Sequence, residues 1–397
     1  MKILHVAASL DPASGGPQQV CVRLAAAQAS LGHEVRVIAY APDEADESIQ
    51  RECAAVPGLQ HVALERVDGA GRMERLLARK ARARLAPHIL DSDCVYIHEI
   101  WDPILRVTAK LAAQAGVPYA VAPHGQLDPW SLRQKRTKKR LALALSYRSM
   151  LEHAAFLHAL NADEVRGFAP LSLSSPVRVI PNGIFLEEIE PLPARGRFRA
   201  QHSELGDDPF VLFLSRLHYK KGLDLLAPAF ARALAVHPRL RLVVAGPDGG
   251  ARAAFERQIV DLGIDGRVHL VGAIYGAEKF EVLVDAACFC LPSRQEGFSV
   301  AITEALACGV PVVVSEACHF PEVAETGAGR VVPLDIDAVA AALIEIAGDG
   351  GLANAMGRAG AALVRERYQW PTIARATLDA IAEACAGRPA QGGSRHA

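Results

Sequence analysis

The sequence lacks a long apolar run, a typical signal peptide and a surplus of basic residues. No apolar stretch approaches the ~20 residues that a helix needs to cross a bilayer, so we expect no membrane-spanning helix. The N-terminal run MKILHVAASL is short and is interrupted by His5, which predicts a first β-strand rather than a signal peptide. The 43 Lys and Arg residues are balanced by 44 Asp and Glu residues. This lack of a basic surplus argues against a dedicated nucleic-acid-binding protein.

The cysteine patterns of disulfide frameworks and zinc sites are also missing. The 397 residues contain eight cysteines, and no two of them form a C-x-x-C pair. Most lie in or beside apolar runs, which favours buried, reduced thiols and therefore a cytoplasmic protein. Hydrophobic residues make up 51% of the chain and aromatic residues 6%, so we expect a folded core filled mainly by alanine, leucine and valine.

Short apolar runs alternate with longer helical patterns along the whole chain. This alternation predicts an α/β fold of parallel sheets with helices on both faces. Proline and glycine concentrate between residues 181 and 209, which indicates a linker between two halves. We therefore expect two doubly wound, Rossmann-like domains that face one another across a cleft. The predicted parts are a first domain at 1–182, a linker at 183–209, a second domain at 210–368 and a disordered tail at 387–397.

The strand ends of the first half carry candidate binding residues, because ligands of such sheets bind beyond the carboxyl ends of the strands. Gly15 and Gly16 precede a helix and allow backbone N–H groups to approach an anion, although the dinucleotide fingerprint G-x-G-x-x-G is absent. Two later strands run into HEIWDP and HGQLDPW, and each delivers a histidine, a carboxylate and a tryptophan. Tryptophan stacks on sugar rings, and the polar groups bond to hydroxyls. The candidates are His98, Trp101, His124, Gln126, Asp128 and Trp130.

A metal site is the alternative use of these strand ends. It would draw on His98, Glu99, His124 and Asp128, but their spacing matches no zinc signature, so we expect no metal.

The second half offers groups that suit a diphosphate. Arg216 and Lys221 in SRLHYKKG lie between a strand end and a helix start, although ordinary surface charge explains them equally well. In EGFSVAITE, the N–H groups from Gly297 to Val300 would point toward an anion from a helix N-terminus. Glu304 lies inside that helix among apolar residues, where its carboxylate needs donors such as ribose hydroxyls. A capping or surface role is the alternative for Glu304.

Basic residues concentrate in two predicted helical stretches, 72–84 and 133–148. A solvated helix face is the simplest interpretation. An anionic membrane surface or a phosphorylated acceptor are sharper alternatives. RNA binding is disfavoured, because no aromatic residues are interleaved with the charges.

Several strings, in this order along the chain, resemble the retaining glycosyltransferases of family 4, which have the GT-B fold. The hallmark is a pair of glutamates separated by seven residues, present as Glu296 and Glu304 in EGFSVAITEAL. The other strings are GGPQQVCVRLAAAQASLGHEV, PHG at 123–125, VIPNGI at 179–184, SRLHYKKG at 215–222 and LVGAIYGAEKFEVLVDAACFCLPS. The resemblance covers nearly the whole chain.

The resemblance implies a role for each matching position. His124 and Glu296 would lie at the reaction centre as catalytic residues, and no metal or other cofactor is implied, because the UDP- or GDP-linked sugar is itself a substrate. The helix at 369–386 would cross back to the first domain. The implied donor-binding residues are Gly15, Gly16, Arg216, Lys221, Ala273, Gly297, Phe298, Ser299, Val300 and Glu304. The implied acceptor-binding residues are His98, Trp101, Gln126, Asp128 and Trp130.

The activity implied is transfer of a sugar from a nucleotide donor to a hydroxyl of a lipid-linked or saccharide acceptor, with retention of anomeric configuration. The expected setting is bacterial exopolysaccharide or lipopolysaccharide synthesis. The protein would be cytoplasmic, and residues 133–148 would touch the inner membrane face. Three alternatives stay open. They are another GT-B enzyme such as an epimerase or phosphorylase, a non-catalytic nucleotide-sugar-binding subunit, and an RNA-binding α/β protein.

Overall fold

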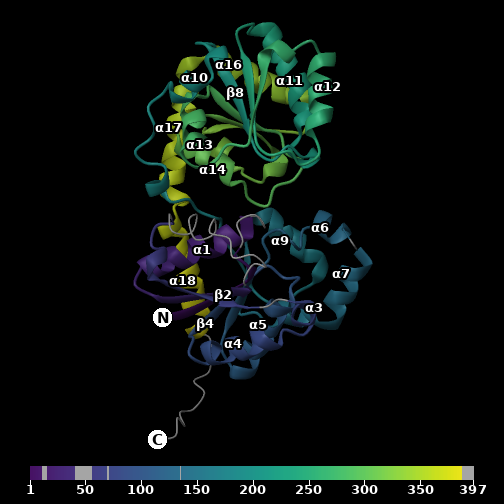
Figure 1. Ribbon diagram of the computed structural model, residues 1–397, viewed down its shortest axis with the longest axis vertical. Helices are drawn as coiled ribbons and strands as arrows, with labels where there is room; N and C mark the ends of the chain where they lie inside the picture. Colours follow the sequence, from purple (N-terminus) through teal and green to yellow (C-terminus); the bar gives the residue numbers. More distant parts are fainter. Residues whose placement is uncertain (11–15, 41–55, 69–70, 135, 387–397) are drawn as a thin grey trace, which may run out of the picture. The chain divides into compact units, whose positions relative to one another are not determined.

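The computed structural model describes residues 1–10, 16–40, 56–68, 71–134 and 136–386 (Figure 1). The predicted tail at 387–397 lies outside these residues. The chain divides into two compact units. Unit 1 comprises Met1–Asn182 together with the chain from Trp370 onward, and unit 2 comprises Gly183–Gln369. Each unit is an α/β domain with one parallel sheet, as the alternation of runs predicts.

Unit 1 contains a seven-stranded sheet in the order β3-β2-β1-β4-β5-β6-β7. Every paired strand in it is parallel to its neighbour. The strand order reverses at β1, which lies between β2 and β4, and such a reversal opens the crevice where doubly wound sheets bind ligands. The strands are β1 (Lys2–Ser9), β2 (Glu34–Tyr40), β3 (Val62–Val67), β4 (Cys94–His98), β5 (Tyr119–Ala122), β6 (Phe156–Ala159) and β7 (Val177–Val179).

The helices of unit 1 connect these strands, and the last of them returns from the end of the chain. Residues 136–148 are helical, with α7 continuing into a π-helical turn, η3. The helices are α1 (Gly16–Ser30), α3 (Arg72–Leu77), α4 (Arg79–Leu90), α5 (Pro103–Ala115), α6 (Pro129–Arg133), α7 (Arg136–Ala142), η3 (Leu143–Tyr147), α8 (Arg148–Glu152), α9 (Ala162–Phe168) and α18 (Trp370–Ala386), with short 3₁₀ turns η2 (Leu59–His61) and η4 (Ala169–Leu171).

Helix α5 illustrates how the sequence sets local structure. The side chain of Asp102 accepts a hydrogen bond from the N–H of Ile104 at 3.1 Å, and Pro103 occupies the first helical position. Gly116 ends the helix with a φ of 67°, a conformation that costs glycine no steric penalty. These signals fix the connection that follows β4, where the sequence predicts binding residues.

Unit 2 contains a six-stranded sheet in the order β10-β9-β8-β11-β12-β13, again with parallel pairs only. Its four central strands are buried on both faces, as expected of parallel strands between helix layers, whereas the edge strands β10 and β13 are partly exposed. The strands are β8 (Phe210–Leu214), β9 (Arg241–Ala245), β10 (Val268–Gly272), β11 (Cys288–Leu291), β12 (Val312–Ser315) and β13 (Gly329–Val332).

The helices of unit 2 end at Arg367, just before the chain returns to unit 1. They are α10 (Arg197–Gln201), α11 (Leu223–Val236), α12 (Arg252–Asp261), α13 (Gly276–Asp285), α14 (Val300–Ala307), α15 (Glu322–Glu325), α16 (Ile336–Gly348) and α17 (Gly350–Arg367). Single 3₁₀ turns are η5 (Leu186–Glu188), η6 (Ser203–Leu205), η7 (Tyr219–Lys221), η8 (Asp265–Arg267) and η9 (Glu316–Cys318).

The segment 183–209 is not the linker that its prolines and glycines suggest. It folds as part of unit 2 and contains η5, α10 and η6. Phe198 and Leu205 are fully buried in the core of unit 2. Asp285, the last residue of α13, accepts hydrogen bonds from the backbone N–H groups of Gly196 and Arg199. Burial of these apolar side chains therefore makes the segment part of unit 2, although prolines and glycines interrupt its regular structure.

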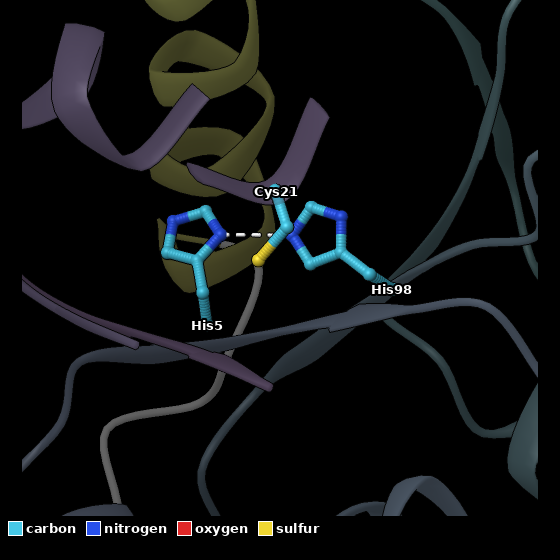
Figure 2. Close-up of side chains that lie close together, drawn as sticks. All are labelled: His5, Cys21 and His98. Carbon is cyan, nitrogen blue, oxygen red and sulfur yellow. Dashed lines mark hydrogen bonds between the residues drawn. The ribbon is translucent and has the colours of Figure 1, made fainter. Parts of the chain in front are cut away.

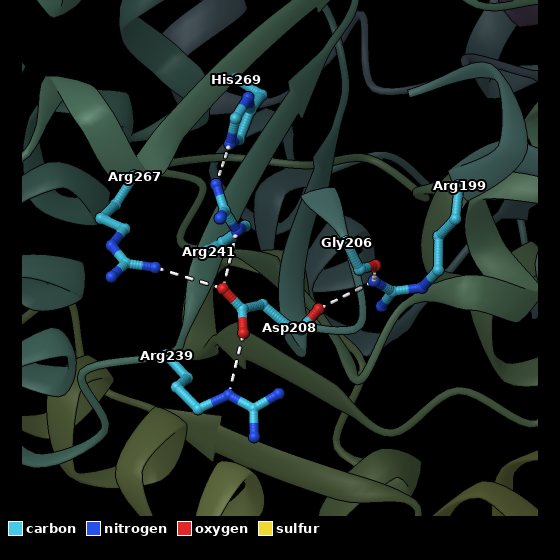
Figure 3. A network of polar contacts seen from close by, with 7 residues as sticks. All are labelled: Arg199, Gly206, Asp208, Arg239, Arg241, Arg267 and His269. Atoms are coloured by element: carbon cyan, nitrogen blue, oxygen red, sulfur yellow. Dashed lines mark hydrogen bonds and ion pairs between the residues drawn. The ribbon is translucent and has the colours of Figure 1, made fainter. Parts of the chain in front are cut away.

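A polar network tightens the amino edge of the unit 2 sheet (Figure 3). The carboxylate of Asp208, just before β8, accepts hydrogen bonds from Arg239 Nε at 2.9 Å, Arg241 Nε at 3.0 Å and Arg267 at 3.2 Å. These arginines lie at or before the starts of β9 and β10, so one carboxylate ties together three neighbouring strands. The network lies at the edge opposite to the carboxyl ends of the strands, which indicates a structural role.

Among the described residues, no helix is both long and apolar enough to span a membrane. Seven of the cysteines lie in the described part of the chain, and all seven are free thiols. Six of them are buried, and Cys385 is half-buried.

Candidate functional site

The carboxyl edge of the unit 2 sheet gathers most of the predicted donor-binding residues. Arg216 follows β8, Ala273 follows β10, and Glu296 follows β11. The strands β10, β9, β8 and β11 are successive neighbours in a parallel sheet, so their carboxyl ends lie along the same edge. Among the described residues, no salt bridge to the exposed guanidinium of Arg216 is found. This edge therefore presents a cation that is available to an anion.

Two glycines make room for this arrangement. A Cβ on Gly249 would lie 2.9 Å from Cγ of Arg216, so glycine is needed for Arg216 to pack there. Gly222 has a φ of 72°, and a Cβ on it would lie 1.9 Å from the carbonyl oxygen of Pro292. This close approach brings η7, which carries Lys221, against the loop that carries Glu296. No role of Gly249 is predicted from the sequence.

Lys221 and Glu296 form an ion pair. Lys221 Nζ lies 2.6 Å from Glu296 Oε1, and the same oxygen accepts a hydrogen bond from Ser293 Oγ at 2.6 Å. The side chains are 20% and 8% exposed, so water screens the pair only partly. The backbone N–H of Glu296 donates to the carbonyl of Ala317 at 3.0 Å, which fixes the loop. The structure thus unites a predicted diphosphate ligand with a predicted catalytic residue.

Helix α14 begins directly after this loop. Ser299 occupies the N-cap position with extended backbone, and no side chain of the described residues caps the helix there. The first-turn N–H groups of an α-helix have no partner within the helix, and their dipoles favour an anion. The side chain of Phe298 packs against Phe320 and Tyr368, with ring centroids 5.9 and 6.0 Å apart. This anchoring holds the helix N-terminus, including Gly297 and Val300, in place.

Glu304 is buried inside α14 and has a partner that the sequence analysis missed. Lys279 Nζ of α13 lies 2.5 Å from Glu304 Oε1, and the two side chains are 26% and 11% exposed. Lys279 occurs in the string GAEKFE, but lysines are common on helix surfaces, and nothing in the spacing to Glu304 points to the contact. One carboxylate oxygen, Oε2, has no partner in the described structure's hydrogen bonds, so Glu304 keeps the capacity to accept from hydroxyls.

In unit 1, two consecutive strand ends hold residues with strained backbone. Glu99 follows β4 with a φ of 71°, and His124 follows β5 with a φ of 51°. Such positive φ values cost a non-glycine residue ~1–3 kcal/mol, and they cluster at functional sites. Glu164 supports the second turn, since its carboxylate accepts from the N–H groups of Gly125 and Leu160, both at 2.7 Å.

Gln126 bridges the two strand-end loops instead of pointing away from them. Its Oε1 accepts from the N–H of Ile100 at 3.0 Å, and its Nε2 donates to Glu99 Oε1 at 2.8 Å. Gln18 of α1 donates to the other oxygen of Glu99 at 3.3 Å. Burial is the main cause that raises the pKa of Glu99 to about 7, and the nearby charge of Asp102 adds to it. From the sequence, Glu99 is considered only as a possible metal ligand, and no sequence signal indicates that its pKa is raised.

His124 forms one end of a row of three histidines. His124 Nε2 lies 3.1 Å from His98 Nδ1, and His98 Nε2 lies 2.9 Å from His5 Nδ1. His98 is only 1% exposed, and both its ring nitrogens are occupied. The prediction that His98 contacts an acceptor directly is wrong, because the side chain is buried and bonds to His124 and His5. Burial lowers the pKa of His124 to about 3 and that of His5 to about 4, so these rings are neutral at pH 7.

The other predicted acceptor residues occupy different environments. One face of the Trp101 ring lies near Lys139 Nζ, 5.2 Å from the centroid, and Tyr147 packs at 5.6 Å. Asp128 is half-buried, and its backbone N–H donates to the carbonyl of Gly125 at 3.3 Å. Trp130 lies in α6, but its side chain is outside the described part, as is all of Gly15. Gly16 begins α1. Their acceptor and donor roles stay predictions.

One group of potential metal ligands occurs among the described residues (Figure 2). The ligand atoms of His5, Cys21 and His98 lie within 4.8 Å of one another, and all three residues are buried. The set differs from the one considered in the sequence analysis, with which it shares only His98. Its two nitrogens are at hydrogen-bonding distance, and burial raises the pKa of the Cys21 thiol, which favours the protonated form. The arrangement fits a hydrogen bond between rings better than a metal ion.

Comparison with known proteins agrees with this geometry. Residues 15–183 match the family described as glycosyl transferase 4-like domain, and residues 194–362 match glycosyl transferases group 1. The chain is 32% identical over 284 residues to a GDP-mannose-dependent α-(1-6)-phosphatidylinositol monomannoside mannosyltransferase of Mycolicibacterium smegmatis, which covers 68% of this chain and 71% of that protein.

Two further comparisons cover more of the chain. A GDP-mannose:cellobiosyl-diphosphopolyprenol α-mannosyltransferase of Xanthomonas campestris is 26% identical, over 84% of each protein. The solved structure of Anabaena HepE in complex with UDP and glucose superimposes with a TM-score of 0.76 at 21% identity, over 96% of this chain and 100% of HepE. The chain therefore belongs to the family 4 glycosyltransferases, and its two Rossmann-like domains are those of the GT-B fold.

Proposed function

We propose that this glycosyltransferase moves a hexose from a nucleoside-diphosphate sugar to a hydroxyl of a lipid-linked or saccharide acceptor, with retention of anomeric configuration. The proposed role is in bacterial exopolysaccharide or lipopolysaccharide synthesis. The observation that carries the proposal is the set of anion-binding groups at one edge of the unit 2 sheet. Arg216, Lys221 and the start of α14, which no described side chain caps, lie there beside Glu296 and the buried Glu304.

Each group has a distinct task in donor binding. Arg216 and Lys221 hold the diphosphate, and the N–H groups at the start of α14 neutralise part of its charge. Glu304 accepts hydrogen bonds from the ribose hydroxyls, and the backbone at Ala273, after β10, faces the nucleobase. Glu296, held by Lys221 and Ser293, contacts the transferred sugar.

The chemical step needs stabilisation of the leaving group. The bond between the sugar C1 and the β-phosphate oxygen breaks, and the diphosphate leaves with the electron pair. The acceptor oxygen bonds to C1 on the same face, and its proton passes to the leaving phosphate oxygen. Two cations and a helix N-terminus lower the barrier by stabilising the negative charge that develops, and loss of one such donor typically costs ~10²–10³ in rate. His124 accepts a hydrogen bond from a hydroxyl at the reaction centre.

The relatives suggest which donor to test first. Two of them are described as acting with GDP-mannose, and one solved structure of the fold contains UDP and glucose. GDP-mannose is therefore the first donor to try, with UDP-glucose for comparison. Both of those mannosyltransferases have lipid-linked acceptors in their names, which supports a lipid-linked acceptor here.

A peripheral membrane contact through residues 133–148 would bring such an acceptor to the enzyme. Helix α7 exposes Arg136, Lys138 and Arg140. Leu141 and Leu145 are 61% and 74% exposed next to them. Exposed leucines beside basic residues on a helix suit an anionic membrane surface, because both the hydrophobic and the electrostatic terms favour adsorption.

The function is tested by incubating the protein with labelled GDP-mannose or UDP-glucose and a bacterial lipid extract. We expect label in a glycolipid or saccharide whose anomeric proton shows the configuration of the donor. An epimerised donor without transfer would identify another GT-B enzyme. Tight nucleotide binding without turnover on any acceptor would identify a non-catalytic subunit. An inverted product would overturn retention alone.

The membrane contact is tested by flotation with vesicles that contain anionic lipid. The double variant Leu141→Glu/Leu145→Glu should lose binding. Leu90→Glu, at a side chain that is 72% exposed at the end of α4 in the same unit, is the matched control and should bind as the wild type does. Binding that does not depend on anionic lipid, or that survives in the double variant, would remove this part of the proposal.

A further inference from the structure

A row of hydrogen bonds runs through unit 1 from the last helix to His124. Thr377 Oγ1 in α18 lies 2.8 Å from the carbonyl oxygen of Ala374, and Gln28 Nε2 in α1 lies 2.9 Å from Thr377 Oγ1. Gln28 Oε1 lies 2.7 Å from His5 Nε2. The row continues through His98, as described above, and ends at His124.

The row is sealed from solvent over most of its length. Thr377, Gln28 and His5 are fully buried, and His98 is 1% exposed. Figure 2 shows the rings of His5 and His98 side by side, joined by their hydrogen bond. The ring centroids are 5.2 Å apart, and those of His98 and His124 are 5.4 Å apart with nearly parallel planes. Buried donors and acceptors are costly to leave without a partner, so a donor must face an acceptor at each step of the row.

The first bond determines the direction of all the others. A carbonyl oxygen can only accept, so the hydroxyl of Thr377 donates its single proton to the carbonyl of Ala374. The same hydroxyl oxygen therefore accepts from the amide nitrogen of Gln28. The amide oxygen of Gln28 then faces His5, so the proton of His5 is on Nε2, and its Nδ1 must accept.

The same reasoning applies to the next two rings. His98 donates from Nε2 to His5 and accepts at Nδ1, so His124 donates from Nε2 to His98. The single ring proton of a neutral His124 therefore lies on Nε2 and is donated to His98. Its Nδ1 keeps a lone pair, and within the described residues no hydrogen-bond partner of Nδ1 is found.

We propose that Thr377, Gln28, His5 and His98 are positioning residues that fix His124 in one tautomer, with Nδ1 presented as a hydrogen-bond acceptor for a ligand hydroxyl. The role in sugar transfer rests on the proposed function, whereas the tautomers themselves do not. The inward bond also fixes the plane of the ring, which is stacked on His98.

The electrostatic environment supports a neutral row. Burial lowers the pKa of His98 well below its ordinary value of 6.5, and the positive charges that His5 and His124 would carry lower it further. The pKa of His124 is lowered to about 3, mainly by burial and also by His158. At neutral pH these rings carry one proton each, so the choice of nitrogen decides what His124 offers.

The tautomers are measured by NMR on protein labelled with ¹⁵N in histidine, because the coupling of each ring nitrogen to ring protons distinguishes Nε2–H from Nδ1–H. We expect His5, His98 and His124 all as Nε2–H in the wild-type full chain. Thr377→Val keeps the side-chain shape but removes the hydroxyl, so Gln28 loses its orientation and Nδ1–H forms should appear at the three rings. Thr377→Ser restores the hydroxyl and should restore the wild-type spectrum.

A matched control is available in α5. Thr108 is also a buried helical threonine, and its hydroxyl bonds only to the carbonyl of Ile104 at 2.8 Å. Thr108→Val should leave the histidine spectrum and transfer unchanged. In Thr377→Val, kcat should fall by roughly threefold to tenfold, the worth of about one neutral hydrogen bond, with an unchanged KM for the donor.

The outcomes separate this inference from the proposed function. Nδ1–H at His124 in the wild type, or a wild-type spectrum in Thr377→Val, overturns the inference even if transfer is found. Stoichiometric binding of added Zn²⁺ with loss of the His5–His98 hydrogen bond would overturn it in favour of a metal site with Cys21. The predicted tautomers in a protein that transfers no sugar would support the row and reject the proposed function alone.

Discussion

Lys221 Nζ lies 2.6 Å from Glu296 Oε1, so a cation predicted to hold the donor diphosphate is already paired with a predicted catalytic carboxylate. The pair positions both groups before a ligand binds. Because Glu296 also accepts from Ser293, we expect its carboxylate to stay in place if Lys221 turns toward a phosphate of the donor.

Removal of the Lys221 charge should weaken nucleotide binding. In Lys221→Met, the affinity for a nucleoside diphosphate is expected to fall by at least about tenfold, since a hydrogen bond to a charged group contributes ~1.5–3 kcal/mol. Isothermal titration measures it. Lys220→Met is the matched control, because the neighbouring Lys220 bonds to Gln295 and not to Glu296. Equal affinities in the two variants would contradict the role of Lys221.

Substitution of His124 should separate binding from transfer. His124 lies in unit 1, whereas the proposed donor-binding side chains of Arg216, Lys221 and Glu304 lie in unit 2. We expect the affinity for a nucleoside diphosphate to stay within about twofold of the wild type and kcat to fall by ~10²-fold, as for loss of one positioned polar group. Steady-state kinetics with a titration check both. Full turnover in His124→Ala would place the reaction centre elsewhere.

Unit 1 should lose stability in acid before unit 2 does. The folded-state pKa values of His5 and His158 are lowered by burial to about 4, and that of His124 to about 3, from an ordinary 6.5. Between pH 6.5 and about 4 the unfolded chain binds protons that the folded unit does not, so stability falls as the pH falls. The slope is up to ~1.4 kcal/mol per pH unit for each such histidine.

Hydrogen exchange resolved to each unit measures this effect. Amides of β4 and β5 should lose protection between pH 6.5 and 4.5 while those of β11 and β12 keep it. The carboxyl of Glu99, with a pKa raised to about 7, acts in the opposite direction, since its protonation on acidification favours the folded state. One carboxyl does not compensate for three histidines. Equal loss in both units would argue against neutral buried rings.

How much of the fold and of the candidate site can be predicted from the sequence depends on the distance along the chain between interacting residues. Arg216, Lys221, Glu296 and Glu304 could be found, because each follows a strand or starts a helix, and such places recur at one edge of a parallel sheet. The row behind His124 could not, because Gln28 and Thr377 are separated by 349 residues and join only after α18 returns to unit 1.

One missed contact and one local error have clear physical causes. His5 lies in the predicted first strand, and nothing in the sequence near it indicates that its ring bonds to Gln28 and His98. The predicted linker was inferred from proline and glycine density, which reports breaks in regular structure and says nothing about the burial of Phe198 and Leu205.

The Asp208 network should stabilise unit 2 without affecting chemistry. Asp208→Ala leaves Arg239, Arg241 and Arg267 without their shared acceptor, and we expect a loss of ~1–3 kcal/mol in the free energy of unfolding, discounted for partial exposure. Urea denaturation measures it. The control is Asp207→Ala at an exposed neighbour. A variant that loses transfer while stability is retained would show that this edge has a functional role.

The most direct test of the account compares the binding of a nucleoside diphosphate with the binding of pyrophosphate. In the wild type, GDP or UDP should bind more tightly than pyrophosphate, because Glu304 contributes hydrogen bonds to the ribose. Glu304→Gln should lower the nucleotide affinity by about tenfold, the worth of one charge-assisted hydrogen bond, and leave pyrophosphate affinity nearly unchanged. If neither nucleotide binds, or if both ligands weaken equally in Glu304→Gln, the assignment of this edge of unit 2 as the donor site is contradicted.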